Sequence, residues 1–208
     1  MVLAPLGLIL FSLLHDSFDG AMRHRLREAD LDAWLTHLTA IQTRWLAVHL
    51  AGLALFPLLG LTVWWMLPPR GLVTRISQAA LAVYMVLYIA LDAVVGLGSY
   101  VLIHHRGEVA AADRAAVDGA FAALFFDSRV TDLLGRAASD AWGIGVVAAA
   151  VAVWMNRGWR VAVPLAIAGY AMSVSHFPPH GAIAGAALGV AVWLCKGANL
   201  YVGAGRLE

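Results

Sequence analysis

The run ISQAALAVYMVLYIALDAVVGLGSYVLI, residues 76–103, decides the fold class, and its only charged residue is Asp92. An α-helix rises about 1.5 Å per residue and the hydrocarbon core of a bilayer is about 30 Å thick, so about 20 apolar residues can cross it. The run exceeds that length. It therefore predicts a transmembrane helix.

The composition of the whole chain agrees with this prediction. Of its 208 residues, 62% are hydrophobic and 13% are charged; the mean hydropathy is +0.78 and the formal net charge is +1. A soluble domain has about 25% charged residues. These values argue against a soluble enzyme, a disordered protein and a partner made of nucleic acid. The single cysteine, Cys195, excludes a disulfide within the chain.

Apolar runs along the chain predict one domain, residues 1–208, with an all-α fold: a polytopic transmembrane helix bundle with six spans. The first run is short, and a signal peptide is the alternative. However, no Lys or Arg precedes this run and no Ala-x-Ala-like cleavage site follows it. The expected spans are about residues 2–16, 45–67, 76–103, 141–155, 161–177 and 181–195.

Two further segments, residues 21–44 and 108–137, are predicted to lie on the outer side as amphipathic helices. In the first, apolar residues recur at helical spacing, as in Leu31, Leu35 and Leu38. Such a helix lies on the membrane or covers the helix bundle. The second has a weaker pattern and is expected to break near Asp127.

Basic residues predict the orientation. With six spans, one side of the membrane holds a single acid, Glu208, and six basic residues. The basic residues are Arg70, Arg75, Arg157, Arg160, Lys196 and Arg206. Short cytoplasmic loops carry an excess of Lys and Arg, so this side is predicted to be cytoplasmic, with both termini. The expected partner is the lipid bilayer.

Asp92 is the one acid placed inside a span, and it is the candidate catalytic residue. A carboxylate at mid-bilayer costs roughly 2.5–3.5 kcal/mol on insertion scales, so it needs a partner or a wet cavity. Asp92 could carry a proton, act as counter-ion to a ligand or serve as a general acid or base. Alternatively, a protonated Asp92 bonds a neighbouring helix. Candidate ligand-binding or partner residues are Ser99, Ser173 and Ser175.

All eight histidines fall on or near the predicted outer side, and four spans contribute them. Imidazole commonly binds zinc, copper and haem iron. A shared site would hold Zn, Cu or haem b; the alternative is a set of separate interfacial histidines. The candidate metal ligands are His49 and His176 first, with His15, Asp16, His104 and His180 to complete the site.

Gly181, Gly185 and Gly189 form two overlapping small-xxx-small steps in the last span. Small residues let helix backbones approach closely. The pattern predicts tight packing, within the chain or between protomers. A homo-oligomer or a larger membrane complex would use this face.

Three stretches resemble a loose group of small bacterial polytopic membrane proteins: WLAVHL at residues 45–50, YIALDAVVGLG at 88–98 and SHFPPHG at 175–181. The resemblance implies a helix bundle in the bacterial inner membrane. The group has no established activity, so no mechanism is transferred. It favours His49, Asp92 and His176 as the positions to test.

The sequence leaves three functions open. The first is a membrane protein or enzyme with an outward-facing His/Asp site that holds a metal or haem and acts on a lipid- or quinone-like ligand. The second is a structural or assembly subunit of a membrane complex. The third is a small proton-coupled transporter or channel that uses Asp92.

Overall fold

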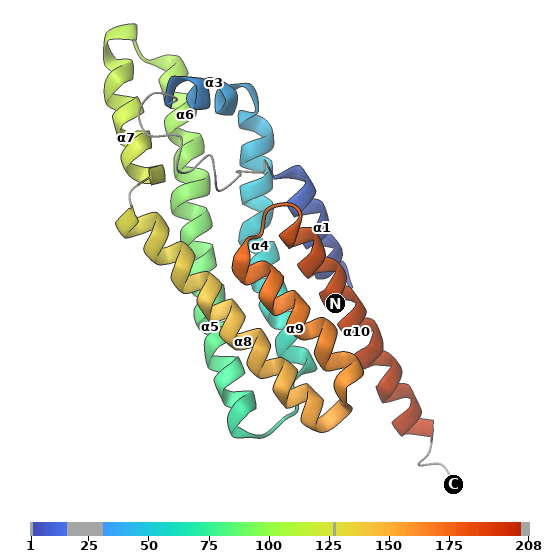
Figure 1. The fold of residues 1–208 in the computed structure, drawn as a ribbon. Coiled ribbons are helices and arrows are strands. Elements are labelled where there is room, and N and C mark those ends of the chain that lie inside the picture. Colours follow the sequence, from blue (N-terminus) through green and yellow to red (C-terminus); the bar gives the residue numbers. More distant parts are fainter. Residues whose placement is uncertain (1, 16–30, 127, 205–208) are drawn as a thin grey trace.

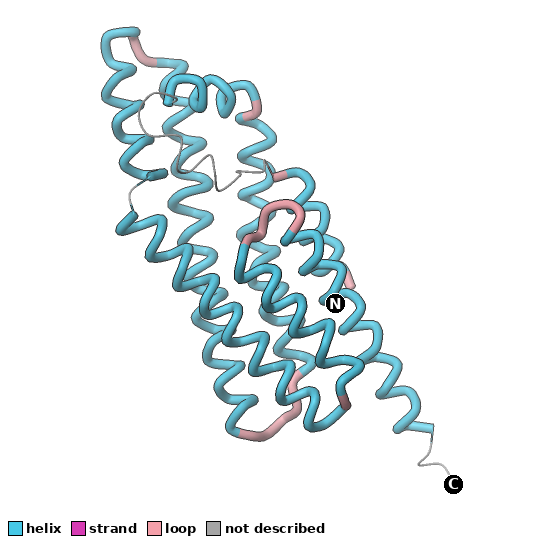
Figure 2. The backbone as a smooth tube through the Cα atoms, viewed as in Figure 1, coloured by secondary structure: helices cyan, strands magenta, loops and turns pink. Residues whose placement is uncertain are grey.

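The computed structural model describes residues 2–15, 31–126 and 128–204, and throughout these ranges the chain forms helices joined by short connections, with no strand (Figures 1 and 2). The helices are α1 Leu3–Leu14, α3 Leu31–Ala40, α4 Gln42–Met66, α5 Leu72–Leu91, the π-helix η1 Asp92–Leu97, α6 Gly98–Glu108, the short η2 Ala111–Asp113, α7 Arg114–Phe126, the π-helix η3 Ser128–Asp132, α8 Leu133–Arg157, α9 Trp159–Val174 and α10 His180–Ala204. The all-α prediction is confirmed for these residues.

Six of the helices form a closed circuit. In the order α1, α4, α5, α8, α9 and α10 each packs on the next, and α10 returns to α1. Each contributes a fully buried apolar side chain to one core, namely Leu8, Phe56, Leu81, Trp142, Leu165 and Leu188. Between membrane helices such side chains stabilise the bundle through close packing rather than through removal from water.

Four helical segments of the described residues are long and apolar enough to cross a membrane: Gln42–Met66, Leu72–Glu108, Leu133–Arg157 and His180–Gly197. By length and composition, they make the chain a membrane protein. The helices α1 and α9 are also apolar, but with 12 and 16 residues they measure only about 18 and 24 Å. The prediction of six spans is therefore supported for four, and the other two stay predictions.

Two helices have ends that differ from the limits of the expected spans. The fourth span was expected to begin at residue 141, yet α8 begins at Leu133, so part of the expected outer segment belongs to this long helix. The polar residues Arg136 and Asp140 face a cavity rather than lipid, so they do not end the helix. The fifth span was expected to reach residue 177, but α9 ends at Val174. Residues that precede a proline pair disfavour helical geometry.

The described part of the first amphipathic segment packs on protein. Trp34, Leu35 and Leu38 of α3 are buried in a second cluster with Ile103 of α6 and Phe121 of α7. Beside this cluster the guanidinium of Arg106 donates to Asp118 of α7 at 2.6 Å and to Asp32 of α3 at 3.0 Å. Residues 21–30 lie outside the described residues. The outer position of this segment stays a prediction.

The glycine face of α10 is used inside the chain. A Cβ built on Gly185 would lie 2.8 Å from the backbone oxygen of Pro5, and one on Gly181 would lie 2.8 Å from Oγ of Ser12. Both neighbours belong to α1, so this face accounts for the contact between α1 and α10. The predicted homo-oligomer through Gly181, Gly185 and Gly189 would meet a face that α1 already covers.

Candidate functional site

One cavity of about 670 Å³ gathers most of the predicted site residues. It lies between the ends of α1 and α9, the beginning of α10, and the sides of α4, η1 and α8. Small-molecule sites commonly enclose about 300–1,000 Å³. Seven of the predicted residues line it: His15, His49, Asp92, Ser173, Ser175, His176 and His180.

Three other predicted residues do not belong to this cavity lining. Ser99 is fully buried in α6, and its Oγ has no hydrogen-bond partner within the described residues. His104 is exposed, with Nε2 3.5 Å from the carboxylate of Glu108. Asp16 lies outside the described residues. His104 follows Asp92 by twelve residues, which corresponds to a rise of about 18 Å along the helix. The helix therefore carries His104 away from the cavity.

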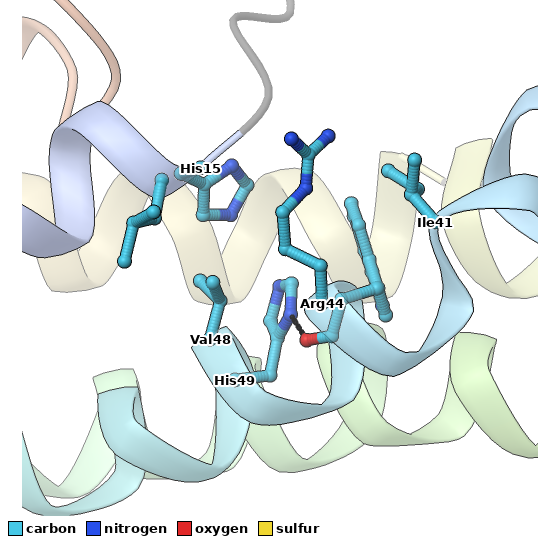
Figure 3. Close-up of a pocket in the computed structure, with 7 residues that line it drawn as sticks. His15, Ile41, Arg44, Val48 and His49 are labelled. Carbon is cyan, nitrogen blue, oxygen red and sulfur yellow. Dashed lines mark hydrogen bonds between the residues drawn. The ribbon is translucent and has the colours of Figure 1, made fainter.

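The centre of the site is a pair formed by His49 of α4 and Asp92 of η1. Nε2 of His49 lies 3.8 Å from Oδ1 of Asp92, and both residues are buried. The other ring nitrogen, Nδ1, lies 2.8 Å from the backbone oxygen of Trp45 (dashed in Figure 3). A carbonyl oxygen can only accept, so Nδ1 carries the hydrogen. Nε2, which faces the carboxyl group, is therefore the proton acceptor of the neutral ring.

Two glycines make room for this pair. A Cβ on Gly96 of η1 would collide with the ring of His49, and a Cβ on Gly52 of α4 would collide with Oδ2 of Asp92. Each polar side chain thus fills the space that a glycine leaves on the facing helix. Within the described residues, the group that approaches the backbone at Gly96 is the ring of His49.

Trp45 connects the two helices that carry the pair. Its backbone oxygen accepts from His49, and its indole Nε1 donates to the backbone oxygen of Gly96 at 2.8 Å. Gly96 lies in η1, and π-helices are rare and frequently occur at functional sites. Sequence reasoning did not name Trp45 as a site residue. The spacing of four residues between Trp45 and His49 was the signal for their contact.

The other histidines pack around the pair. The ring centroid of His15 lies 5.1 Å from that of His49 and 5.4 Å from that of His176. Figure 3 shows His15, from the end of α1, beside His49 of α4. Nδ1 of His176 shares a hydrogen bond of 2.7 Å with the hydroxyl of Tyr88. His15, His49, His176 and Tyr88 therefore bring four protonatable or hydrogen-bonding groups to the cavity that Asp92 also lines.

This arrangement does not form a metal centre. Within the described ranges, no three or more His, Cys, Asp or Glu side chains are placed to hold a metal ion. His15 packs on His49 and His176 edge to face, at interplanar angles of 66° and 76°. Rings 5.1 Å apart leave no layer for a porphyrin between them. The predicted zinc, copper and haem b sites therefore find no support in this part of the chain.

A polar face of α8 completes the cavity, and sequence reasoning missed it. Its residues recur at the spacing of one helical face: Asp132, Arg136, Ser139 and Asp140. The signal was present in the sequence. However, a helix face that borders a cavity has the same composition as one that borders bulk water, so the segment was assigned to the outside.

No protein-family model, no curated protein and no solved structure matches this chain. Its function is therefore argued from the geometry of the cavity. The resemblance to small bacterial membrane proteins stays a prediction, as do the inner-membrane location and the cytoplasmic termini.

Proposed function

We propose that this chain is an integral membrane protein that binds an amphiphilic, lipid- or quinone-like ligand in the 670 Å³ cavity and exchanges a proton with it through His49 and Asp92. The observation that carries the proposal is the buried pair on the cavity wall, with Nε2 of His49 at 3.8 Å from Oδ1 of Asp92. Ionisable groups inside a membrane are expensive and mark functional sites by default.

The pair has the properties of a proton-transfer site. The bond from Nδ1 to Trp45 leaves Nε2 as the acceptor, and Oδ2 of Asp92 has no hydrogen-bond partner within the described residues. Imidazole and carboxyl groups serve as general acids and bases when they reach the ligand directly or through one water. A ligand oxygen or nitrogen in the cavity would be the other partner of the transfer.

The position of the cavity favours an amphiphile. The α4–α5 and α8–α9 connections lie at one end of the bundle, and from that end α9 stops well short of α4 (Figure 1). With 25 residues α4 measures about 38 Å, whereas the 16 residues of α9 measure about 24 Å. A bilayer core is about 30 Å thick, so the space beyond α9 lies near the boundary between acyl chains and head groups.

The lining of the cavity agrees with a ligand that has an apolar and a polar part. Leu91, Val95 and Phe125 provide apolar surface, while Ser139 and Ser173 provide hydroxyls. A hydrocarbon chain would pack on these apolar side chains, and a head group would form hydrogen bonds with the hydroxyls.

Apolar side chains on the outer surface support six membrane-embedded helices. Each helix of the circuit exposes at least one large apolar side chain: Leu3, Leu58, Val86, Met155, Tyr170 and Trp193. A belt of this kind fits contact with lipid. We place the cavity on the outer side of a bacterial inner membrane and both termini in the cytoplasm, because six basic residues and one acid mark the opposite side.

The experiment is calorimetric titration of the delipidated, full-length protein with decylubiquinone and with a short-chain phospholipid, in two buffers of different ionisation enthalpy. The difference between buffers gives the number of protons exchanged on binding. We expect a non-zero number that His49→Gln and Asp92→Asn abolish. His104→Gln is the matched control, because the same change is made at an exposed histidine. Binding without proton exchange would overturn the role of the pair.

A proton-coupled transporter is the second candidate. Asp92 lies within the helical segment Leu72–Glu108, which has the highest mean hydropathy of the four candidate spans, at 2.2. In that case the protein in liposomes would move protons with a solute, and Asp92→Asn would stop the flux. If neither ligand binding nor flux is found and both variants are tolerated, the predicted role as an assembly subunit is the remaining function.

A further inference from the structure

The α8 side of the cavity carries charges of both signs. Asp132, Arg136 and Asp140 all line it, and they follow one another at intervals of four residues. Residues with this spacing lie on the same face of a helix. Arg136 and Asp140 are exposed, and Asp132 is half-buried. The cavity therefore has a row of acid, base and acid along one wall.

These three side chains are not neutralised by the protein. Acidic and basic residues four apart can form ion pairs along a helix. Yet none of the three has a salt bridge or a side-chain hydrogen bond in the part of the chain that the structure describes. Charged groups at the edge of a membrane need water or a ligand as partner. The row is thus available to a bound head group.

Aromatic rings form other parts of the lining. Trp45, Phe125 and Phe177 are among the lining residues. A cation within about 6 Å of an aromatic face is attracted to it. The cavity therefore offers two kinds of surface to a cation, carboxylates and rings.

The balance of charge selects the head group. The lining contains the acids Asp92, Asp132 and Asp140 against the single base Arg136, with histidines counted as neutral. A purely anionic head group would meet more repulsion than attraction. A neutral quinone would leave the charges of α8 without partners. A head group with one anionic and one cationic part would satisfy both.

The geometry points to an amine-bearing zwitterionic phospholipid, of the phosphatidylethanolamine type, as the ligand, with its phosphate at Arg136 and its ammonium at Asp132 or Asp140. This inference rests on one part of the proposed function, the binding of an amphiphile in the cavity, and it narrows the ligand class; it does not depend on proton exchange through His49 and Asp92. Arginine binds phosphate through a planar fork of N–H donors. Primary ammonium donates hydrogen bonds to carboxylates, whereas a quaternary choline cannot. We therefore expect the order ethanolamine, choline, glycerol in decreasing affinity.

The test uses the delipidated full-length protein in dodecyl maltoside, titrated with dihexanoyl phosphatidylethanolamine, -choline and -glycerol and with decylubiquinone. We expect phosphatidylethanolamine to bind about tenfold or more tightly than phosphatidylglycerol, because charge-assisted hydrogen bonds contribute about 1.5–3 kcal/mol. Arg136→Gln should weaken both lipids, since both carry phosphate. The double variant Asp132→Asn/Asp140→Asn should weaken phosphatidylethanolamine alone. Arg70→Gln, at an exposed arginine outside the cavity lining, is the matched control and should change neither.

Each contrary result has a separate meaning. Equal affinity for ethanolamine and glycerol lipids would overturn the inference. So would an unchanged affinity for both lipids in Arg136→Gln, or an unchanged preference in the double variant Asp132→Asn/Asp140→Asn. Binding of decylubiquinone with proton exchange, but of no phospholipid, would overturn the inference and leave the proposed function standing. Binding of no amphiphile would overturn both. Circular dichroism and gel filtration show whether each variant is folded before its affinity is compared.

Discussion

Two helix contacts in this bundle are built on glycine, and they differ in what fills the glycine's space. Between α1 and α10, Gly185 faces Pro5 and Ile9, which are apolar. Between α4 and η1, Gly52 and Gly96 face an acid and an imidazole, as described above. Small residues allow close approach in both.

The difference separates packing from function. Apolar side chains between membrane helices need no further explanation, because dispersion and close fit hold such helices together. An acid and an imidazole in the same position cost free energy to bury unless they are paired. Their presence at the α4–η1 contact therefore indicates a task beyond packing. Substitutions at the two sets of glycines can test this distinction.

The largest effect is expected from Gly96→Ala. The new Cβ would occupy the space of the His49 ring and displace it from Asp92, because overpacking a well-packed contact forces side chains to move. We expect proton exchange on ligand binding to be lost, with a destabilisation of about 1–3 kcal/mol. Buffer-dependent calorimetry and thermal unfolding measure the two effects.

Gly98→Ala is the matched control for that change. It lies two residues away, and its Cβ would meet only the flexible end of Leu124, at 3.0 Å. It should keep proton exchange. If Gly96→Ala behaves like Gly98→Ala, the close fit between His49 and η1 has no functional importance.

Gly185→Ala should have a smaller overall effect and one of a different kind. Its Cβ would lie 2.8 Å from the backbone oxygen of Pro5, and a backbone cannot move aside cheaply. We expect a destabilisation of about 1–3 kcal/mol. The proton number and ligand affinity of the folded protein should stay unchanged, because Gly185 faces Pro5 and Ile9 of α1 and neither residue lines the cavity.

Gly189→Ala provides the control on the same helix. Its Cβ would lie 3.7 Å from Cβ of Pro5, an ordinary contact, so its stability should stay near that of the original chain. A loss of proton exchange in Gly185→Ala would contradict the distinction between the two contacts. Equal stability of Gly185→Ala and Gly189→Ala would contradict the packing role of Gly185.

The same contrast shows what the sequence could and could not predict. The run at residues 76–103 has the length and hydropathy of a span. Residue type and position drew attention to Asp92 and the histidines, and the resemblance favoured His49, Asp92 and His176 among them. That His49 faces Gly96 depends on the relative shift of α4 and η1 along their axes, which is set by tertiary packing. The predicted metal site finds no support among the described residues for a related reason. Histidines at one membrane level need not turn their nitrogens toward one point.

The smallest of the three effects is expected from Trp45→Phe. Phenylalanine keeps the backbone oxygen that accepts from His49 but removes the indole N–H that donates to Gly96. The lost bond should reduce stability by about 1 kcal/mol. If the indole also holds η1 in register with α4, the affinity for the ligand should fall several-fold. The number of protons exchanged on binding should then change over a different pH range than in the unsubstituted protein. Calorimetry across a pH series measures this.

A purely structural role for Trp45 would give the stability loss with an unchanged pH series. A useful comparison is Trp193→Phe, because Trp193 is 72% exposed on α10 and lies outside the cavity lining. It removes the same N–H group and should alter neither quantity. A shifted pH series in Trp45→Phe alone would therefore assign the indole to the positioning of the His49–Asp92 pair. The α4–η1 contact would then differ from the α1–α10 contact in its hydrogen bonds as well as in the side chains that fill the space left by its glycines.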